Sequence, residues 1–177
     1  MNVQLPLQNY FVKLEPLKAT DFEKLFAIAR DPLIWEQHPN KDRYKREVFE
    51  VFFKGAIEST GAYVIYDAKT NAVIGSSRYY DLNIEKSSIT IGYTFFARSH
   101  WGGIYNRATK EAMMLHAFEY VNEVNFHIGA VNIRSQKAIE KLGAQKIGEI
   151  EMAYYGEASK LNFIYSITKL NWQIQNR

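Results

Sequence analysis

The sequence lacks cysteine altogether, has only four prolines in 177 residues, and contains no long uninterrupted hydrophobic run. The lack of cysteine excludes disulfide bonds, thiolate nucleophiles and zinc–thiolate sites, and it fits a reducing compartment. No stretch is long enough to span a bilayer, and the first residues lack the basic and apolar regions of a signal peptide. We therefore expect a soluble, cytoplasmic protein without a membrane partner.

An excess of charge of one sign is also missing. The chain has 22 basic and 19 acidic side chains, mixed along its length, for a net charge of +3. Without a basic block we expect no nucleic-acid partner, although a modest anionic ligand is compatible with this charge. The four histidines show no metal-like spacing, so we expect no metal site. With 47% hydrophobic residues, the chain can fill one core, which predicts a single domain over residues 1–177.

What is present is a regular alternation of strand and helix patterns. Their order is β-α-α-β-β-β-α-β-α-β-β, which predicts an α+β domain with a mixed sheet. Strands are expected at 10–17, on both sides of a turn at 69–71, at 87–97, at 126–132, and at 144–156 and 161–170. Helices are expected from 20 to 30, from 43 to 59, after the glycines at 102 and 103, and from 132 to 143.

Four helix ends carry recognisable signals. Thr20 and Glu23 have the spacing of a capping box. Asn132 can cap the start of the last predicted helix, and Gly143 stands where that helix should end. Asn106 is expected to cap the helix that follows the paired glycines.

That glycine-containing loop is the first candidate site. In "SHWGGIYNRATKEAMMLHAFEY", Gly102 and Gly103 allow close approach of a ligand to a helix N-terminus, where N–H groups and the helix dipole favour phosphate. Arg107 and Lys110 add positive charge nearby. The alternative is that the glycines only let the chain turn. The spacing matches neither a Walker loop nor a dinucleotide fingerprint, so the local pattern indicates an anion site and no more.

Two longer segments carry a family resemblance. The run "IGYTFFARSHWGGIYNRATKEAMMLHAFEY", followed by "VNIRSQKAIEKLGAQKIGE", resembles the signature segments of the Gcn5-related N-acetyltransferases (GNAT), most closely the ribosomal-protein alanine acetyltransferases and their relatives. "DPLIWEQHP" and "VIGSSRYYDLNIEKSSITIGY" resemble that branch too. The second segment has the spacing N-x-R-S…K-L-G, at Asn132, Arg134, Ser135, Lys141, Leu142 and Gly143.

The resemblance implies a fold and a cofactor. The fold would be a single α+β domain with a mixed, mostly antiparallel sheet of about six to seven strands, splayed between the fourth and fifth, and about four helices. The cofactor would be acetyl-CoA. Its pantetheine would bind the backbone of Phe95, Phe96 and Ala97, and its pyrophosphate would lie at Trp101, Gly102, Gly103, Ile104, Tyr105 and Asn106. Asn132, Ser135 and Lys137 would complete the cofactor site.

Several positions depart from the family pattern. An ungapped alignment places Trp101, Ile104 and Asn106 where the phosphate loop usually has Gln or Arg, Gly, and Gly or Ala. Ile139 stands where many members have a tyrosine that protonates the thiolate. Thr90 replaces a glutamate that is common in this branch.

The resemblance and the residues together suggest candidates for the chemistry. Ser135 is the nearest motif hydroxyl to the thiol, although a serine at a helix start often bonds its own backbone. His38, with an ordinary pKa suited to proton transfer, could relay a proton from the amine through water, although a loop histidine beside a proline is often a bystander. The acceptor pocket is expected around Glu36, Arg78, Tyr80 and Tyr93, with Tyr154 and Tyr155 near it.

The predicted function is transfer of acetyl from acetyl-CoA to a primary amine, either a small molecule, a peptide or a protein N-terminus. The amine would attack the thioester directly in a ternary complex. The alternative is a regulatory module that binds acyl-CoA with little turnover, which Ile139 and Thr90 favour. A monomer and a homodimer are both left open.

Overall fold

The computed structural model describes residues 3–153 and 158–175. One eight-stranded sheet with the order β1-β2-β3-β4-β5-β6-β8-β7 runs through it, and only the β5–β6 pair is parallel. The strands are β1 Leu7–Gln8, β2 Val12–Pro16, β3 Ala62–Asp67, β4 Val73–Asn83, β5 Ser88–Phe96, β6 Glu123–Gly129, β7 Gln145–Ala153 and β8 Ser159–Thr168. The described α-helices are α1 Phe22–Ala29, α2 Arg46–Glu58, α3 Tyr105–Ala117, α4 Ile133–Glu140 and α5 Lys169–Gln175.

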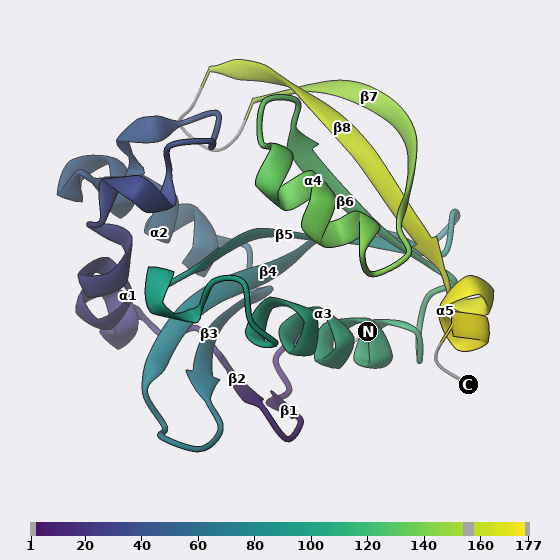
Figure 1. Cartoon of the computed structure of the whole chain (residues 1–177), viewed down its shortest axis with the longest axis horizontal. Helices are drawn as coiled ribbons and strands as arrows, with labels where there is room; N and C mark the ends of the chain where they lie inside the picture. Colours follow the sequence, from purple (N-terminus) through teal and green to yellow (C-terminus); the bar gives the residue numbers. More distant parts are fainter. Residues whose placement is uncertain (1–2, 154–157, 176–177) are drawn as a thin grey trace.

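The helices cover both faces of the sheet (Figure 1). Strand β4 shows why, because successive side chains of a strand point to opposite faces. Tyr79 is 1% exposed and donates its hydroxyl to the Met113 carbonyl of α3 at 2.5 Å. Arg78 points the other way and donates to the Gly55 carbonyl of α2 at 3.2 Å. Helix α3 therefore packs on one face, and α1 and α2 pack on the other.

The sheet divides between β5 and β6. These strands pair only from Ser88 to Thr90 and from Glu123 to Asn125. Beyond Thr90, β5 continues along β4 while β6 continues along β8, so the two halves of the sheet diverge (Figure 1). From Ile91 onward, none of the described strands pairs with the edge of β5 that faces β6, which creates the space for a site.

The α+β class, the mixed sheet and the position of the splay are confirmed. The described chain has one strand and one helix more than expected: the two-residue β1, and α5, which buries Trp172. Strand β6 begins three residues before its predicted start and ends at Gly129. Short 3₁₀ helices at Ala19–Asp21, Pro32–Ile34, Lys41–Tyr44 and Arg98–His100 were also not predicted.

The capping signals have mixed outcomes. The capping box at Thr20 and Glu23 is wrong: Asp21 accepts from the Lys18 N–H at 3.0 Å, and Glu23 forms an ion pair with Arg46 across α1 and α2. The signals of α4 are confirmed. Its N-cap, Asn132, accepts from the Ser135 N–H at 3.2 Å, and Gly143 follows the helix with a φ of +90°.

Candidate functional site

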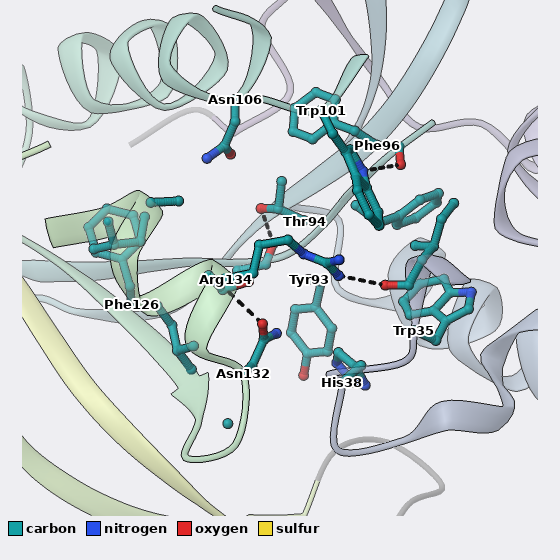
Figure 2. Close-up of a pocket in the computed structure, with 18 of the residues that line it drawn as sticks. Trp35, His38, Tyr93, Thr94, Phe96, Trp101, Asn106, Phe126, Asn132 and Arg134 are labelled. Carbon is teal, nitrogen blue, oxygen red and sulfur yellow. Dashed lines mark hydrogen bonds between the residues drawn. The ribbon is translucent and has the colours of Figure 1, made fainter. Parts of the chain in front are cut away.

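A cavity of about 230 Å³ lies in the splay. It is lined by β5, β6, the loop before α3, the start of α4 and the segment between α1 and α2 (Figure 2). The expected site residues that line it are His38, Tyr93, Phe95, Phe96, Trp101, Gly102, Gly103, Asn106, Asn132 and Ser135. The structure places the others outside this lining: Glu36, Arg78, Tyr80, Ala97, Ile104, Tyr105 and Lys137. Tyr154 and Tyr155 lie outside the described residues.

A β-bulge deforms β5 at the middle of the cavity. Tyr93 has a φ of +53°, and the register with β4 shifts between Ser76 and Arg78. A bulge re-aims backbone groups next to the strand edge, and a positive φ in a tyrosine is strained. On the edge of β5 away from β4, no described strand pairs with the bulge, so N–H groups on that edge can face a ligand.

Fewer backbone groups of β5 face the cavity than expected. The Ala97 N–H donates to the Ile74 carbonyl of β4 at 2.8 Å, so it does not face the cavity. Because backbone groups alternate between the two edges of a strand, the N–H and carbonyl of Phe96 face the cavity. That carbonyl accepts from the indole N–H of Trp101 at 3.0 Å (Figure 2). Of the expected pantetheine contacts, the Phe96 N–H is the one best placed for a ligand.

The loop before α3 keeps the expected form but differs in detail. Gly102 has a φ of +71°, and a side chain at Gly102 or Gly103 would meet nothing within 4 Å, so this backbone is open to a ligand. The first-turn N–H groups of α3 have no partner within the helix. Asn106 as the cap is wrong, because the N-cap is Ile104 and Asn106 lies inside the helix, where it lines the cavity.

Tyr105 anchors the start of α3 to the rest of the fold. Its hydroxyl donates to Asp67 at 2.6 Å, and the other oxygen of Asp67 accepts from the N–H groups of Lys69 and Thr70 in the β3–β4 turn. These hydrogen bonds, led by that of Tyr105, lower the pKa of Asp67 to about 2. The helix end that would face a phosphate is thereby held in place.

Arg134 crosses the cavity from the start of α4 (Figure 2). Its guanidinium lies 3.9 Å from the centre of the Trp101 ring and donates to the Ile34 carbonyl at 3.1 Å. Glu36 lies 3.6 Å from it, as an ion pair at the rim. Burial lowers the pKa of Arg134. The arginine of the N-x-R-S segment thus connects the start of α4 to the loop before α3 and to the segment between α1 and α2, across the site. The sequence alone did not indicate this role.

His38 lines the cavity, but its environment differs from the expected loop histidine. Arg43 lies 3.1 Å from its Nε2, and because a guanidinium can only donate, Nε2 accepts this hydrogen bond. Nδ1 contacts the backbone of Asn40, 2.9 Å from its N–H and 3.0 Å from its carbonyl. Burial, followed by the charge of Arg43, holds the pKa of His38 well below its ordinary value. The ring is neutral at physiological pH, so the expectation of an ordinary pKa is wrong.

Behind the bulge lies a buried arginine. Arg78 is 5% exposed, and its guanidinium stacks 4.0 Å from the Tyr93 ring centre while it binds the carbonyls near the end of α2. Burial lowers its pKa to about 10. Tyr80 lies beside Tyr93 and 3.3 Å from His127. Arg78 and Tyr80 therefore support Tyr93 from behind and do not line the cavity themselves.

Lys110 lies in an environment that differs from the one expected from the sequence. We expected it to add charge beside the phosphate loop, but it points from α3 into the splay and is 3% exposed. Its ammonium donates to Thr94 at 2.5 Å and to Ser77 at 3.4 Å, and Phe126 of β6 lies 5.7 Å away. Burial lowers its pKa to about 7. Its position on the buried face of α3 is the sequence signal that could have predicted its burial.

Other classes of site find no support in the described part of the chain. It contains no group of three or more His, Cys, Asp or Glu side chains that could hold a metal ion. No helix among the described residues combines the length and hydrophobicity needed to cross a membrane.

Comparison with known proteins identifies the domain. Residues 12–145 match the model of the acetyltransferase (GNAT) domain, which is most of the chain. The chain belongs to the GNAT family. No curated protein matches it significantly. As a GNAT acetyltransferase, it has its bulged strand, its glycine-containing loop and its splay in the part of the chain that the family model covers.

Solved structures share the fold. A GNAT-family protein from Chromobacterium violaceum ATCC 12472 superposes with a TM-score of 0.83 at 19% identity, covering 96% of this chain and 89% of the other. RimJ from Mycobacterium smegmatis, in complex with CoA-disulfide, gives 0.68 at 18% identity, covering 94% and 87%. Spermidine N-acetyltransferase from Vibrio cholerae, in complex with CoA and spermine, gives 0.69 at 15% identity, covering 93% and 99%. At these identities the likeness concerns the fold.

Proposed function

We propose that this GNAT domain, acting as one domain over the whole chain, transfers the acetyl group of acetyl-CoA to a primary amine by direct attack in a ternary complex. The observation that carries the proposal is the unpaired, bulged edge of β5, which opens onto the same cavity as the loop before α3. An extended arm that carries amides can bind such an edge as an added strand. A phosphate fits the helix N-terminus at its end.

The cofactor would lie across the cavity. The open backbone at Gly102 and Gly103, with the first turn of α3, would hold the pyrophosphate. The Phe96 N–H and the Asn132 amide would bind the pantetheine from opposite sides of the splay. Acetyl-CoA would supply the activated acyl group, and the bulge at Tyr93 would present N–H groups to the thioester carbonyl, where negative charge develops during attack.

The acceptor amine would enter from the side of His38 and Tyr93. Holding both reactants in line can supply much of the acceleration. His38 would relay the amine proton through water once Arg43 releases its Nε2, and Ser135 would hydrogen-bond the sulfur. Support for this role of Ser135 comes from its place in the cavity lining, at the start of α4.

The acceptor class stays open between small amines and peptide N-termini. The two CoA complexes among the similar structures are RimJ and a spermidine acetyltransferase, so both classes belong in a screen. We propose a small-molecule or peptide amine as the acceptor in preference to a basic protein tail, because the charge pattern of the sequence predicts no strongly acidic groove that would attract such a tail.

The test has two steps. Calorimetry with acetyl-CoA should show one site, and thiol release should then accelerate with at least one amine from a panel of spermidine, amino acids and peptides beginning with Ala or Ser. His38→Ala should change the pH–rate profile if His38 relays the proton. Binding without turnover on the whole panel would instead support the acyl-CoA-binding module. No binding would contradict both functions.

A further inference from the structure

We propose that Lys110 is the proton donor to the departing CoA thiolate, a role that rests on the proposed acetyl transfer. Lys110 projects from the second turn of α3 into the space where β5 and β6 diverge, and its amine lies between the two strands, against Thr94 of β5 and Phe126 of β6. The same cavity holds the bulge that would bind the thioester.

The surroundings of Lys110 do not explain it as a structural charge. Removing an ammonium from water is costly unless a carboxylate compensates it. Within the residues that the structure describes, no carboxylate lies within ion-pair distance of Lys110, and its polar partners are the hydroxyls of Thr94 and Ser77. Methionine or leucine would fill this position at a lower cost. A buried amine kept beside a cavity is typical of a functional group.

The groups that face the amine are uncharged, so burial determines its protonation state. Ser77 of β4, Thr94 of β5 and Phe126 of β6 do not titrate in the physiological range. The titratable and charged groups elsewhere in the lining are His38, Arg43, Tyr93, His100, His127 and Arg134. With a pKa of about 7, Lys110 exists in both protonation states near neutrality, as an efficient proton donor should.

The acceptor nitrogen forms a bond to the thioester carbon, and the C–S bond breaks with its electron pair going to sulfur. The Nζ–H of Lys110 gives its proton to that sulfur, which yields the CoA thiol and a neutral amine. The excess proton of the acceptor nitrogen leaves to water, and Lys110 takes a proton from water after the thiol departs.

This role fills a gap in the site. Ile139 lines the cavity at the position where the resemblance places a tyrosine donor, and its side chain cannot supply a proton. Ser135 offers a hydroxyl, but a serine hydroxyl is a far weaker acid than an ammonium. Lys110 reaches the cavity from the opposite element, α3, so it could act without the tyrosine.

The test does not require the natural acceptor. Free CoA is bound to the protein, and its thiol is titrated by thiolate absorbance in wild type, Lys110→Met and Lys110→Arg. A nearby positive charge favours the thiolate, so the pKa of the bound thiol should lie about one unit lower in Lys110→Arg, whose guanidinium stays charged while the thiol titrates, than in Lys110→Met, a tenfold difference in thiolate at a given pH. Lys54→Met, which removes an exposed lysine from α2, is the matched control and should match wild type.

Turnover with the best amine of the panel supplies the second readout. In wild type, kcat should fall above about pH 7 as Lys110 loses its proton, whereas Lys110→Met should lose about 100-fold in kcat together with that limb. The Kd for CoA should change by less than about threefold. Lys110→Arg keeps the positive charge, but a guanidinium does not release its proton, so kcat should stay well below that of wild type.

Each result bears on the proposal. Equal pKa values for the bound thiol in Lys110→Arg and Lys110→Met, or wild-type kcat in Lys110→Arg, would overturn the proton donor while the acetyltransferase stands. Absence of CoA binding to wild type would overturn both. If Lys110→Met does not fold, Thr94→Val replaces it: loss of the hydroxyl acceptor should move the alkaline limb to lower pH, and an unmoved limb would contradict the proposal.

Discussion

At the scale of single residues, Lys110 shows how burial changes the chemistry of an ordinary side chain. An exposed lysine in the same helix would stay charged to about pH 10. Under the sheet, with two hydroxyls in place of water, its pKa is about 7. The same change couples Lys110 to the stability of the fold, whatever the protein acetylates.

The sign of that coupling can be measured. The pKa of Lys110 is about 7 when folded and about 10.5 when unfolded, so the unfolded chain binds more protons between these values and stability rises with pH across that window. From pH 7 to pH 9 this contributes about 2 kcal/mol. Lys110→Met should be more stable than wild type at pH 7, and the difference should shrink toward pH 9, as measured by urea unfolding.

Lys54→Met is the control for this experiment, because Lys54 is exposed on α2 and its removal should leave the pH dependence unchanged. A constant difference between wild type and Lys110→Met from pH 7 to pH 9 would show that Lys110 titrates normally.

At the scale of elements, the site depends on how two helices begin. Helix α4 begins at a side-chain cap, Asn132. Substitutions at this residue can therefore separate its contribution to stability from its contribution to ligand binding. Asn132→Ala should lower the free energy of unfolding by about 1 kcal/mol, whereas Asn132→Ser should keep the cap and the stability. Both variants lack the amide proposed to bind pantetheine, so calorimetry should show weaker CoA binding in both. Full CoA affinity in Asn132→Ser would remove Asn132 from the cofactor site.

Helix α3 has no side-chain cap and is instead held by Tyr105 on Asp67. The pKa of Asp67 is about 2 when folded, below its ordinary value, so its contribution to stability is present above about pH 4 and is lost as the pH falls through about 2. Tyr105→Phe removes the leading hydrogen bond, so the pKa of Asp67 should rise, and NMR titration of its carboxyl can follow this.

The stability of Tyr105→Phe should differ from that of wild type above about pH 4 and converge with it near pH 2. A pKa that stays at about 2 in the variant would assign the shift to the turn amides of Lys69 and Thr70 alone.

At the scale of the whole molecule, Arg134 connects the start of α4 to the loop before α3 and to the segment between α1 and α2, across the cavity. Its contacts with Trp101 and the Ile34 carbonyl are the clearest link over the site. Arg134→Ala should lower the free energy of unfolding by about 1–2 kcal/mol, since it loses a cation–π contact and a charged hydrogen bond. Hydrogen exchange should also quicken in residues 31–44 and at the start of α4.

Lys54→Ala should change stability by less than about 0.5 kcal/mol, as expected for an exposed side chain, which makes it the matched comparison. If exchange in Arg134→Ala quickens evenly over the sheet, the arginine contributes to overall stability without connecting these elements.

Much of the fold followed from local patterns. The hairpin at 69–71 was predicted from its composition, and Asp67 accepts from the N–H groups of that turn as such turns require. The cap at Asn132 and the end at Gly143 were likewise local signals. The capping box at Thr20 was wrong because a partner on another helix, Arg46, binds Glu23, and no local pattern records such a partner.

The sequence by itself determined the order of elements, the GNAT resemblance and the segments that form the site, because periodicity, caps and motif spacing act between neighbours in the chain. Only the tertiary structure decided the state of the site's side chains. The charge of Lys110, the engaged lone pair of His38 and the span of Arg134 depend on groups from other elements. Burial and hydrogen bonding set these properties, and both arise only when distant segments pack together.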